Sequence, residues 1–96
     1  MPQALRDRLA SEIVQVGFGD LRPHARRGGL FVVHGAIDLV TVGVAVVGDD
    51  AKSVQTWISA GRLSRPTPAQ LAAWEADETA RFDSLIAQPF VLVRPI

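Results

Sequence analysis

The chain has 96 residues, which is enough for one domain with a single hydrophobic core. Ten basic and ten acidic side chains balance, so no overall charge favours nucleic acid or an acidic membrane as a partner. The absence of cysteine excludes a disulfide scaffold and thiolate zinc sites, and the N-terminus carries no signal-peptide pattern. We therefore expect one soluble, cytoplasmic domain over residues 1–96.

The N-terminal part of the chain predicts a helix over residues 4–16, because apolar residues recur there at helical spacing. This stripe consists of Leu5, Leu9, Ile13 and Val16. Gly17 and Gly19 favour the end of that helix. Asp20 is then expected to cap a short helical turn over 21–25.

The most apolar stretch, residues 30–47, predicts a long antiparallel β-hairpin that turns at Gly35-Ala36. In its second arm, alternate residues point to opposite faces, and neither face carries a charge before Gly48. Both faces of such a hairpin need cover, from helices or from a second copy of the chain.

Two more helices are expected after this hairpin. Asp49 or Asp50 can cap the first of them, whose apolar stripe would end at Gly61. The second begins with Thr67-Pro68-Ala69-Gln70, in which Thr67 caps, Pro68 takes the first helical position and Gln70 completes a capping box. The two tryptophans, Trp57 and Trp74, fall on the apolar stripes and are expected in the core.

The C-terminal stretch, about residues 86–93, has the composition of a strand. Pro89 lacks an N–H for the ladder, which predicts an edge strand or a bulge there. Together these elements predict an α+β fold: a three-stranded, mostly antiparallel sheet, made of the hairpin and this strand, with three or four helices.

Several stretches resemble one family of small uncharacterised bacterial proteins, the domain-of-unknown-function family numbered two-two-eight-eight. The matching residues are Leu21–Ala25 with Arg27-Gly28, Asp38–Ala45, Trp57-Ile58 with Gly61 and Leu63, and Ile86–Leu92. They follow one another over nearly the whole chain. The resemblance implies a free-standing bacterial domain, with no activity to carry over to these residues.

The residues that could bind a ligand gather near His24. Arg22, Arg26 and Arg27 surround it in sequence, and imidazole and guanidinium groups together can hold a small anion. The alternative is structural: the His24 ring bonds a backbone carbonyl and fixes the turn into the hairpin. His34 is placed at the hairpin tip, where an exposed residue usually has no role.

No metal site or nucleophile emerges from the sequence. Asp38 and Asp49 would lie at opposite ends of an extended strand, too far apart for one cation, and helix capping explains Asp49 and Asp50. No Gly-x-Ser-x-Gly elbow or phosphate loop is present. We therefore expect no cofactor and lean toward a non-catalytic protein, although folding could still bring His24 to a serine.

Nucleic acid is a weak candidate partner. The two later helices resemble a helix-turn-helix, but the second of them is acidic and would be repelled by phosphates. A non-catalytic, self-associating interaction module, most simply a homodimer, is the function this reasoning favours. The alternative is a small ligand- or anion-binding protein, or an enzyme, that uses the corner of His24, Arg22, Arg26 and Arg27.

Overall fold

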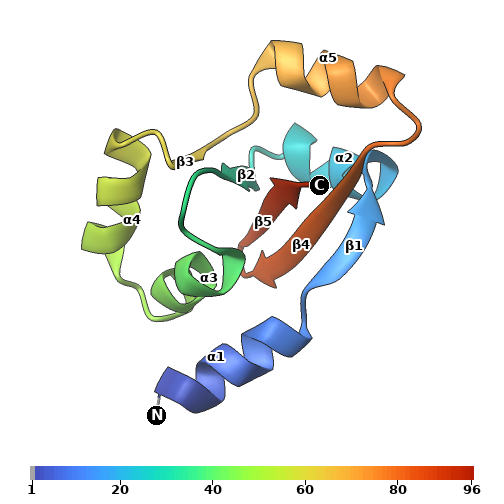
Figure 1. The fold of residues 1–96 in the computed structure, drawn as a ribbon. Coiled ribbons are helices and arrows are strands. Elements are labelled where there is room, and N and C mark those ends of the chain that lie inside the picture. The colour runs from blue at the N-terminus through green and yellow to red at the C-terminus, as the bar shows by residue number, and fades with distance from the viewer. Residues whose placement is uncertain (1) are drawn as a thin grey trace.

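The computed structural model describes residues 2–96, which form five helices and one five-stranded sheet (Figure 1). The helices are α1 (Pro2–Ser11), α2 (Phe18–Arg26), α3 (Leu39–Val47), α4 (Ala51–Ser59) and α5 (Pro68–Ala76). The strands are β1 (Val14–Gly17), β2 (Leu30–Val33), β3 (Leu63–Ser64), β4 (Arg81–Ala87) and β5 (Phe90–Pro95). The α+β class is confirmed, with more strands and helices than the sequence predicted.

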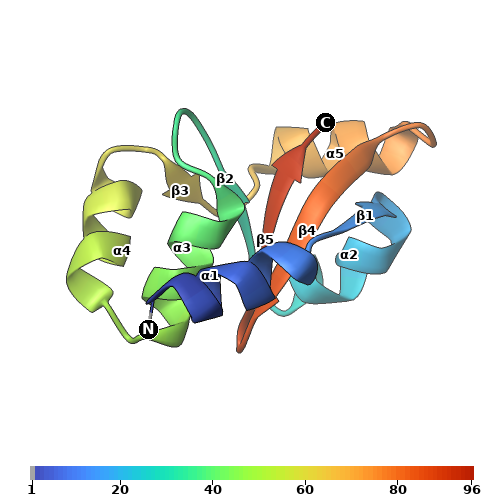
Figure 2. The ribbon, with the colours of Figure 1, turned by 60° about the horizontal axis from the view of Figure 1, so that its bottom comes forward.

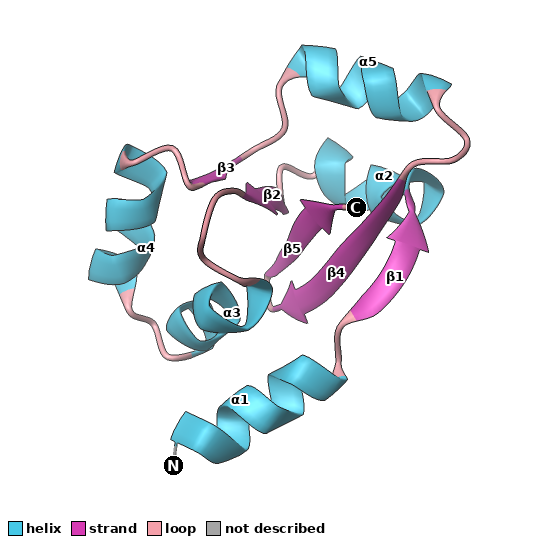
Figure 3. Cartoon of the chain, in the orientation of Figure 1, coloured by secondary structure: helices cyan, strands magenta, loops and turns pink. Residues whose placement is uncertain are grey.

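The sheet has the strand order β1-β4-β5-β2-β3, so β1 and β3 are its edges (Figure 3). Only β2 and β5 run parallel; the other neighbours are antiparallel. Strands β4 and β5 form the longest ladder, with Ser84 opposite Val93 and Ile86 opposite Val91. Within residues 2–96 the sheet is therefore mixed, and its centre comes from the C-terminal part of the chain.

The two faces of the sheet are covered by different helices (Figure 2). On the face that we call the covered face, α1 and α3 bury a core of Leu9, Val33, Leu39, Val42, Leu63, Leu85, Ala87 and Leu92. On the opposite face, here the open face, α2 and α5 bury Phe18, Leu21, Leu30, Val32, Phe82, Val91 and Val93. Trp74 completes this second core by packing on Phe18 and Phe82, as expected of a core tryptophan.

The predicted hairpin over 30–47 is wrong, because its second arm is helix α3. The Asp38 side chain accepts a hydrogen bond from the Thr41 N–H at 2.7 Å and caps this helix. A run that is apolar throughout fits the helical period as well as the strand period, so its alternation did not decide between them. The two-sided hairpin was the reason for expecting self-association, and that reason is lost.

Gly43 explains how α3 sits so close to the sheet. A Cβ built on Gly43 would lie 2.8 Å from Leu85 Cδ2 and 3.3 Å from Leu9 Cδ1. A larger residue would push the helix away from both neighbours. Gly43, which the sequence placed in the second arm of the hairpin, is thus a helix–sheet contact.

The first predicted helix is also too long. Helix α1 ends at Ser11, and Val14–Gly17 form the edge strand β1, with Val14 opposite Ser84 and Val16 opposite Phe82. Gly17, and not Asp20, is the N-cap of α2, and Asp20 lies in its first turn. Val14 and Val16 alternate with Gln15, which is the strand period.

The C-terminal prediction of a single strand, at the sheet edge or with a bulge at Pro89, is wrong as well. Residues 81–95 form two strands, and Pro89 lies in the turn between them, after a cis Gln88–Pro89 bond. Strand β5 lies inside the sheet, where Pro89 would interrupt the ladder. The helix ends were predicted better: Thr67 and Gln70 form the capping box, Asp50 caps α4, and Gly61 follows α4 with φ +74°.

Candidate binding groove

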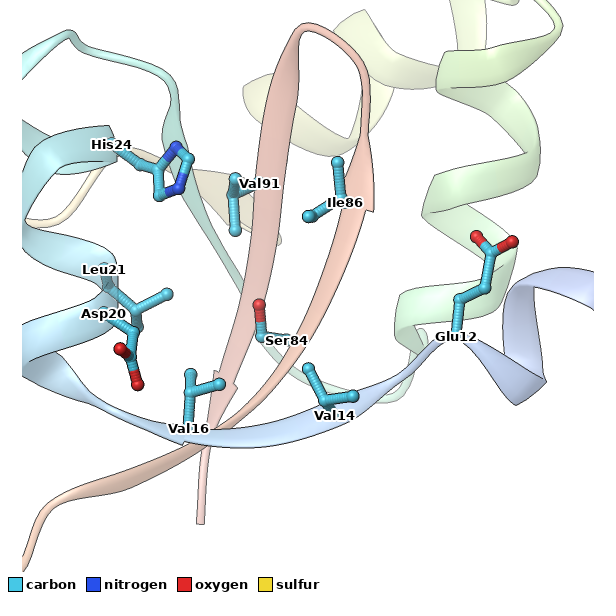
Figure 4. A pocket seen from close by; sticks show the side chains of 9 residues that line it. All are labelled: Glu12, Val14, Val16, Asp20, Leu21, His24, Ser84, Ile86 and Val91. Carbon is cyan, nitrogen blue, oxygen red and sulfur yellow. The ribbon is translucent and has the colours of Figure 1, made fainter.

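A hollow of about 410 Å³ lies on the open face, between helix α2 and strands β1, β4 and β5 (Figure 4). We call it the α2 groove. Its lining residues are Glu12, Val14, Val16, Asp20, Leu21, His24, Ser84, Ile86 and Val91. A volume of this size, with an apolar floor and a few polar groups, is typical of a ligand-binding site.

The groove exists because the helices cover only one end of the open face. Phe82 and Val93 are buried beneath α2 and α5, whereas Val14 and Ile86 are each 56% exposed. The segment before Val14 is helix α1, which packs on the covered face. It therefore leaves this end of the open face bare. The floor is therefore apolar sheet surface that no helix of residues 2–96 buries.

His24 brings a defined hydrogen-bond donor to the groove. Its Nδ1 lies 2.8 Å from Arg27 Nη2, and an arginine can only donate, so Nδ1 accepts. Nε2 is then the ring nitrogen that can donate into the groove. In Figure 4 the ring extends from α2 toward Val91, on the groove side of the helix. The partner of His24 is thus a side chain, and not the backbone carbonyl of the structural alternative.

Ser84, His24 and Asp20 line the same groove, which invites comparison with a catalytic triad. A triad needs one hydrogen bond from serine to histidine and another from histidine to the carboxylate. Within residues 2–96 His24 makes neither bond, and Arg27 occupies its Nδ1. Figure 4 shows the three side chains apart around the groove. The fold brings a serine near His24 without assembling nucleophilic machinery.

The predicted anion-binding residues are divided between two sides of α2. Arg22 donates to Glu75 of α5, with 3.0 Å between Nε and Oε2 and a second bond from Nη2 to Oε1. This hydrogen bonding lowers the pKa of Glu75 and raises that of Arg22. Arg26 lines a small hollow with Arg22 on the α5 side. The structure therefore brings His24 together with Arg27, and Arg22 with Arg26, but separates the two pairs.

The other predicted candidates have structural contacts. His34 follows β2, and its Nε2 lies 3.1 Å from Ser64 Oγ, linking the two neighbouring strands. Hydrogen bonds from Thr41, chiefly from its backbone N–H, lower the pKa of Asp38, and bonds from Ser53 lower that of Asp50. In the part of the chain that the structure describes, no group of three acidic, histidine or cysteine residues is placed to hold a metal ion.

Sequence reasoning missed the residues that form the groove floor. It placed Val14 within a helix and Ile86 in a strand at the sheet edge or next to a bulge, and it gave no role to Ser84 or Glu12. The alternation of Val14, Gln15 and Val16 was a usable signal for a strand. Whether the apolar face of this strand stays uncovered depends on where α2 ends. No local sequence pattern contains that information.

The fold and the groove together define a small α+β domain in which helices bury the apolar part of one face of a mixed sheet and leave an apolar part of the other face open. The family described as "Protein of unknown function (DUF2288)" matches residues 4–95, so the chain belongs to this family. A similar solved structure is the NMR solution structure of PA1075 from Pseudomonas aeruginosa, with a TM-score of 0.78 and 28% sequence identity. The match covers 95% of this chain and 83% of that one.

A search of curated proteins found no match to this chain. Among residues 2–96, no helix has the length and apolar character needed to cross a bilayer. The resemblance that the sequence suggested is therefore confirmed at the level of the family. Neither the family nor the similar solved structure is described with a ligand or a reaction, so the function has to be argued from the groove itself.

Proposed function

We propose that this protein is a non-catalytic interaction module, and that the α2 groove binds an amphipathic helix of another protein. The observation that carries the proposal is the uncovered floor: Val14 and Ile86 are exposed on β1 and β4, although Leu85 and Ala87, on the other face of β4, are buried. A helix laid beside α2 would complete the second helical layer. Helix-in-groove binding of this kind buries apolar side chains at spacings of three and four residues.

The polar groups of the groove suit binding better than catalysis. Ser84 and His24 offer hydrogen bonds to a docked chain, and Asp20 and Glu12 lie at its edges. Neither His24 nor Ser84 has the partner that general-base or nucleophilic chemistry requires. Their positions beside an apolar floor match the usual division of a binding site, with apolar area for affinity and few polar groups for orientation.

The test uses an uncharged 14-residue helical peptide, in which the sequence Leu-Gln-Gln-Leu-Leu-Gln-Leu occurs twice. Titrated into ¹⁵N-labelled protein, it is expected to shift amide signals of β1, β4 and α2. The substitution Ile86→Glu should remove these shifts, because it places a charge on the apolar floor. The matched control is Ile58→Glu on α4, where the isoleucine is 42% exposed and lies outside the groove.

Two results would contradict the proposal. One is the absence of any localised shift with the peptide at millimolar concentration. The other is an unchanged response from Ile86→Glu.

Binding of a small anion by His24, Arg22, Arg26 and Arg27 is a second candidate function. One observation favours it, the adjacent donors of His24 and Arg27 beside the groove. Against it, Glu75 already pairs with Arg22, and the carboxylates of Glu12 and Asp20 line the same groove as His24. A titration with inorganic phosphate separates the two functions: saturable shifts around His24 would favour the anion site, and we expect none.

The cytoplasmic location inferred from the sequence stays a prediction, whereas the homodimer inferred there is one that we no longer expect. Symmetric pairing through the α2 groove would bring Glu12 and Asp20 of one copy close to the same residues of the other. Like charges at short distance oppose such a pair. We therefore expect the mass of a single chain by light scattering at micromolar concentration, and a dimer would restore the self-associating module.

A further inference from the structure

We infer that the helix bound by this protein is basic, with lysine or arginine side chains along both borders of its apolar stripe. This inference rests on the proposed function, because it names the partner of the same groove. Two observations beyond the exposed groove floor support it. These are the extent of the exposed apolar surface and the sign of the charges around it.

The apolar surface continues past the α2 groove, around the ends of β4 and α3. A second hollow, of about 450 Å³, lies there and shares Glu12 and Ile86 with the α2 groove. It is lined by Arg8, Leu9, Glu12, Val46, Val47, Asp49, Ile86, Ala87 and Gln88. Val47 in this hollow is 43% exposed, and Ile86 lines both hollows, so we refer to the exposed side chains of Val14, Ile86 and Val47 as the apolar ridge.

Carboxylates dominate the charged groups along this ridge. Glu12, Asp20 and Asp49 line the two hollows, and Arg8 is the one guanidinium among the lining residues. Arg8 Nε lies 3.8 Å from Glu12 Oε2, so this cation is partly neutralised already. With histidine counted as neutral, as in the formal charge of the chain, the lining residues carry a net charge of −2, or −1 when Arg27 beside His24 is included, whereas the whole chain is formally neutral. The negative charge is thus concentrated at the exposed apolar surface.

This negative charge distinguishes between the partners that could bind the apolar ridge. A second copy docked symmetrically would place carboxylates opposite carboxylates. Nucleic acid and an anionic lipid surface would be repelled for the same reason. A basic amphipathic helix satisfies both features, because its apolar stripe covers the ridge while its cations reach the carboxylates on either side.

The experiment compares three labelled peptides that differ only in their polar residue. Each has the 14-residue pattern used above, with lysine, glutamine or glutamate at every polar position. By fluorescence anisotropy in about 20 mM salt, the lysine peptide is expected to bind about tenfold more tightly than the glutamine peptide, since two or three exposed ion pairs add modestly. The glutamate peptide should bind most weakly, and at about 0.5 M salt the three affinities should converge.

Variants separate the site from general attraction between charges. The double substitution Glu12→Gln with Asp20→Asn should remove most of the lysine preference and leave binding of the glutamine peptide unchanged. The matched control is Glu78→Gln, which removes a carboxylate that lines neither hollow and should keep the preference. Circular dichroism melting confirms that each variant is folded, as expected for exposed positions.

The outcomes distinguish this inference from the proposed function. If the three peptides bind equally at low salt and Ile86→Glu abolishes all binding, the basic partner is wrong and the helix-binding module stands. If no peptide binds, both are wrong. If the lysine preference survives the double substitution, the attraction is not located at this groove and the inference fails.

Discussion

The two faces of the sheet differ in how completely they are covered, and neighbouring residues of β4 show it most clearly. Leu85 points to the covered face and is 0% exposed, packed against α1 and α3. Ile86, the next residue, points to the open face and is 56% exposed beside α2. The two side chains have the same composition and nearly the same hydrophobicity. Their different exposure is set by which helices reach each face.

The helices on the two faces also make different kinds of contact. On the covered face, α3 approaches the sheet closely because Gly43 presents no side chain to Leu85. On the open face, the aromatic cluster of Phe18, Trp74 and Phe82 fixes α2 and α5 at one end of the sheet. Bulky aromatic packing at that end leaves the other end of the face bare. Stability therefore resides mainly in the covered face and in this cluster, and the groove is free for binding.

The largest expected effect comes from truncating the two neighbours in β4. Leu85→Ala should lower the free energy of unfolding by about 2–5 kcal/mol, because it leaves a cavity beneath α3. Ile86→Ala should lower it by at most about 1 kcal/mol, since the removed atoms are already in water. Chemical denaturation of both variants measures the difference. Equal losses would show that the open face is covered in solution.

An intermediate effect is expected at the closest helix–sheet contact. Gly43→Ala places a methyl group 2.8 Å from Leu85 Cδ2, so α3 or Leu85 must shift. The expected loss is about 1–3 kcal/mol, although alanine is the better helix former. Gly19→Ala is the matched control, because a Cβ there meets nothing within 4 Å. A Gly43→Ala protein more stable than the parent would contradict the close packing of the covered face.

The smallest effect is a pH dependence that originates beside the covered face, at the cap of α3. Hydrogen bonds from Thr41 lower the pKa of Asp38, so the folded state favours its charged form. This contribution is fully present above the unfolded pKa of about 4 and is lost as the pH falls through the lower folded value. The melting temperature should therefore decrease below about pH 5, with Asp50, Glu75 and Asp77 acting in the same direction.

Substitutions of Asp38 test whether this cap is a source of the pH dependence. Asp38→Ala should lower stability by about 1 kcal/mol at pH 7, because the Thr41 N–H loses its acceptor. Asp38→Asn should preserve most of the stability at pH 7 and flatten the acid transition, since asparagine caps without titrating. Asp49→Asn is the control, at a residue whose φ of 55° asparagine tolerates. An identical melting profile for Asp38→Asn and the parent would exclude Asp38 as a source.

The sequence alone determined the local chemistry at the start of α4, after its end and at the start of α5. The capping box of Thr67 and Gln70, the Asp50 cap and the glycine after α4 are all present, because such signals act within four or five residues. It also determined the α+β class and, through its resemblance, the family. Each of these depends on short-range patterns or on the chain read as a whole, and neither requires knowledge of which elements meet.

Tertiary structure decided what the apolar runs became. Residues 39–47 suit a strand or a helix; the Asp38 cap is a local signal for the helix, and the contact with Leu85 packs that helix on the sheet. In the packed structure β1 lies at the sheet edge and Ile86 is exposed, and this leaves the groove open. Hydrophobic burial depends on area shared between segments far apart in the chain, such as α3 with β4. A local pattern shows that a residue is apolar, and only the packed structure shows whether that residue is buried.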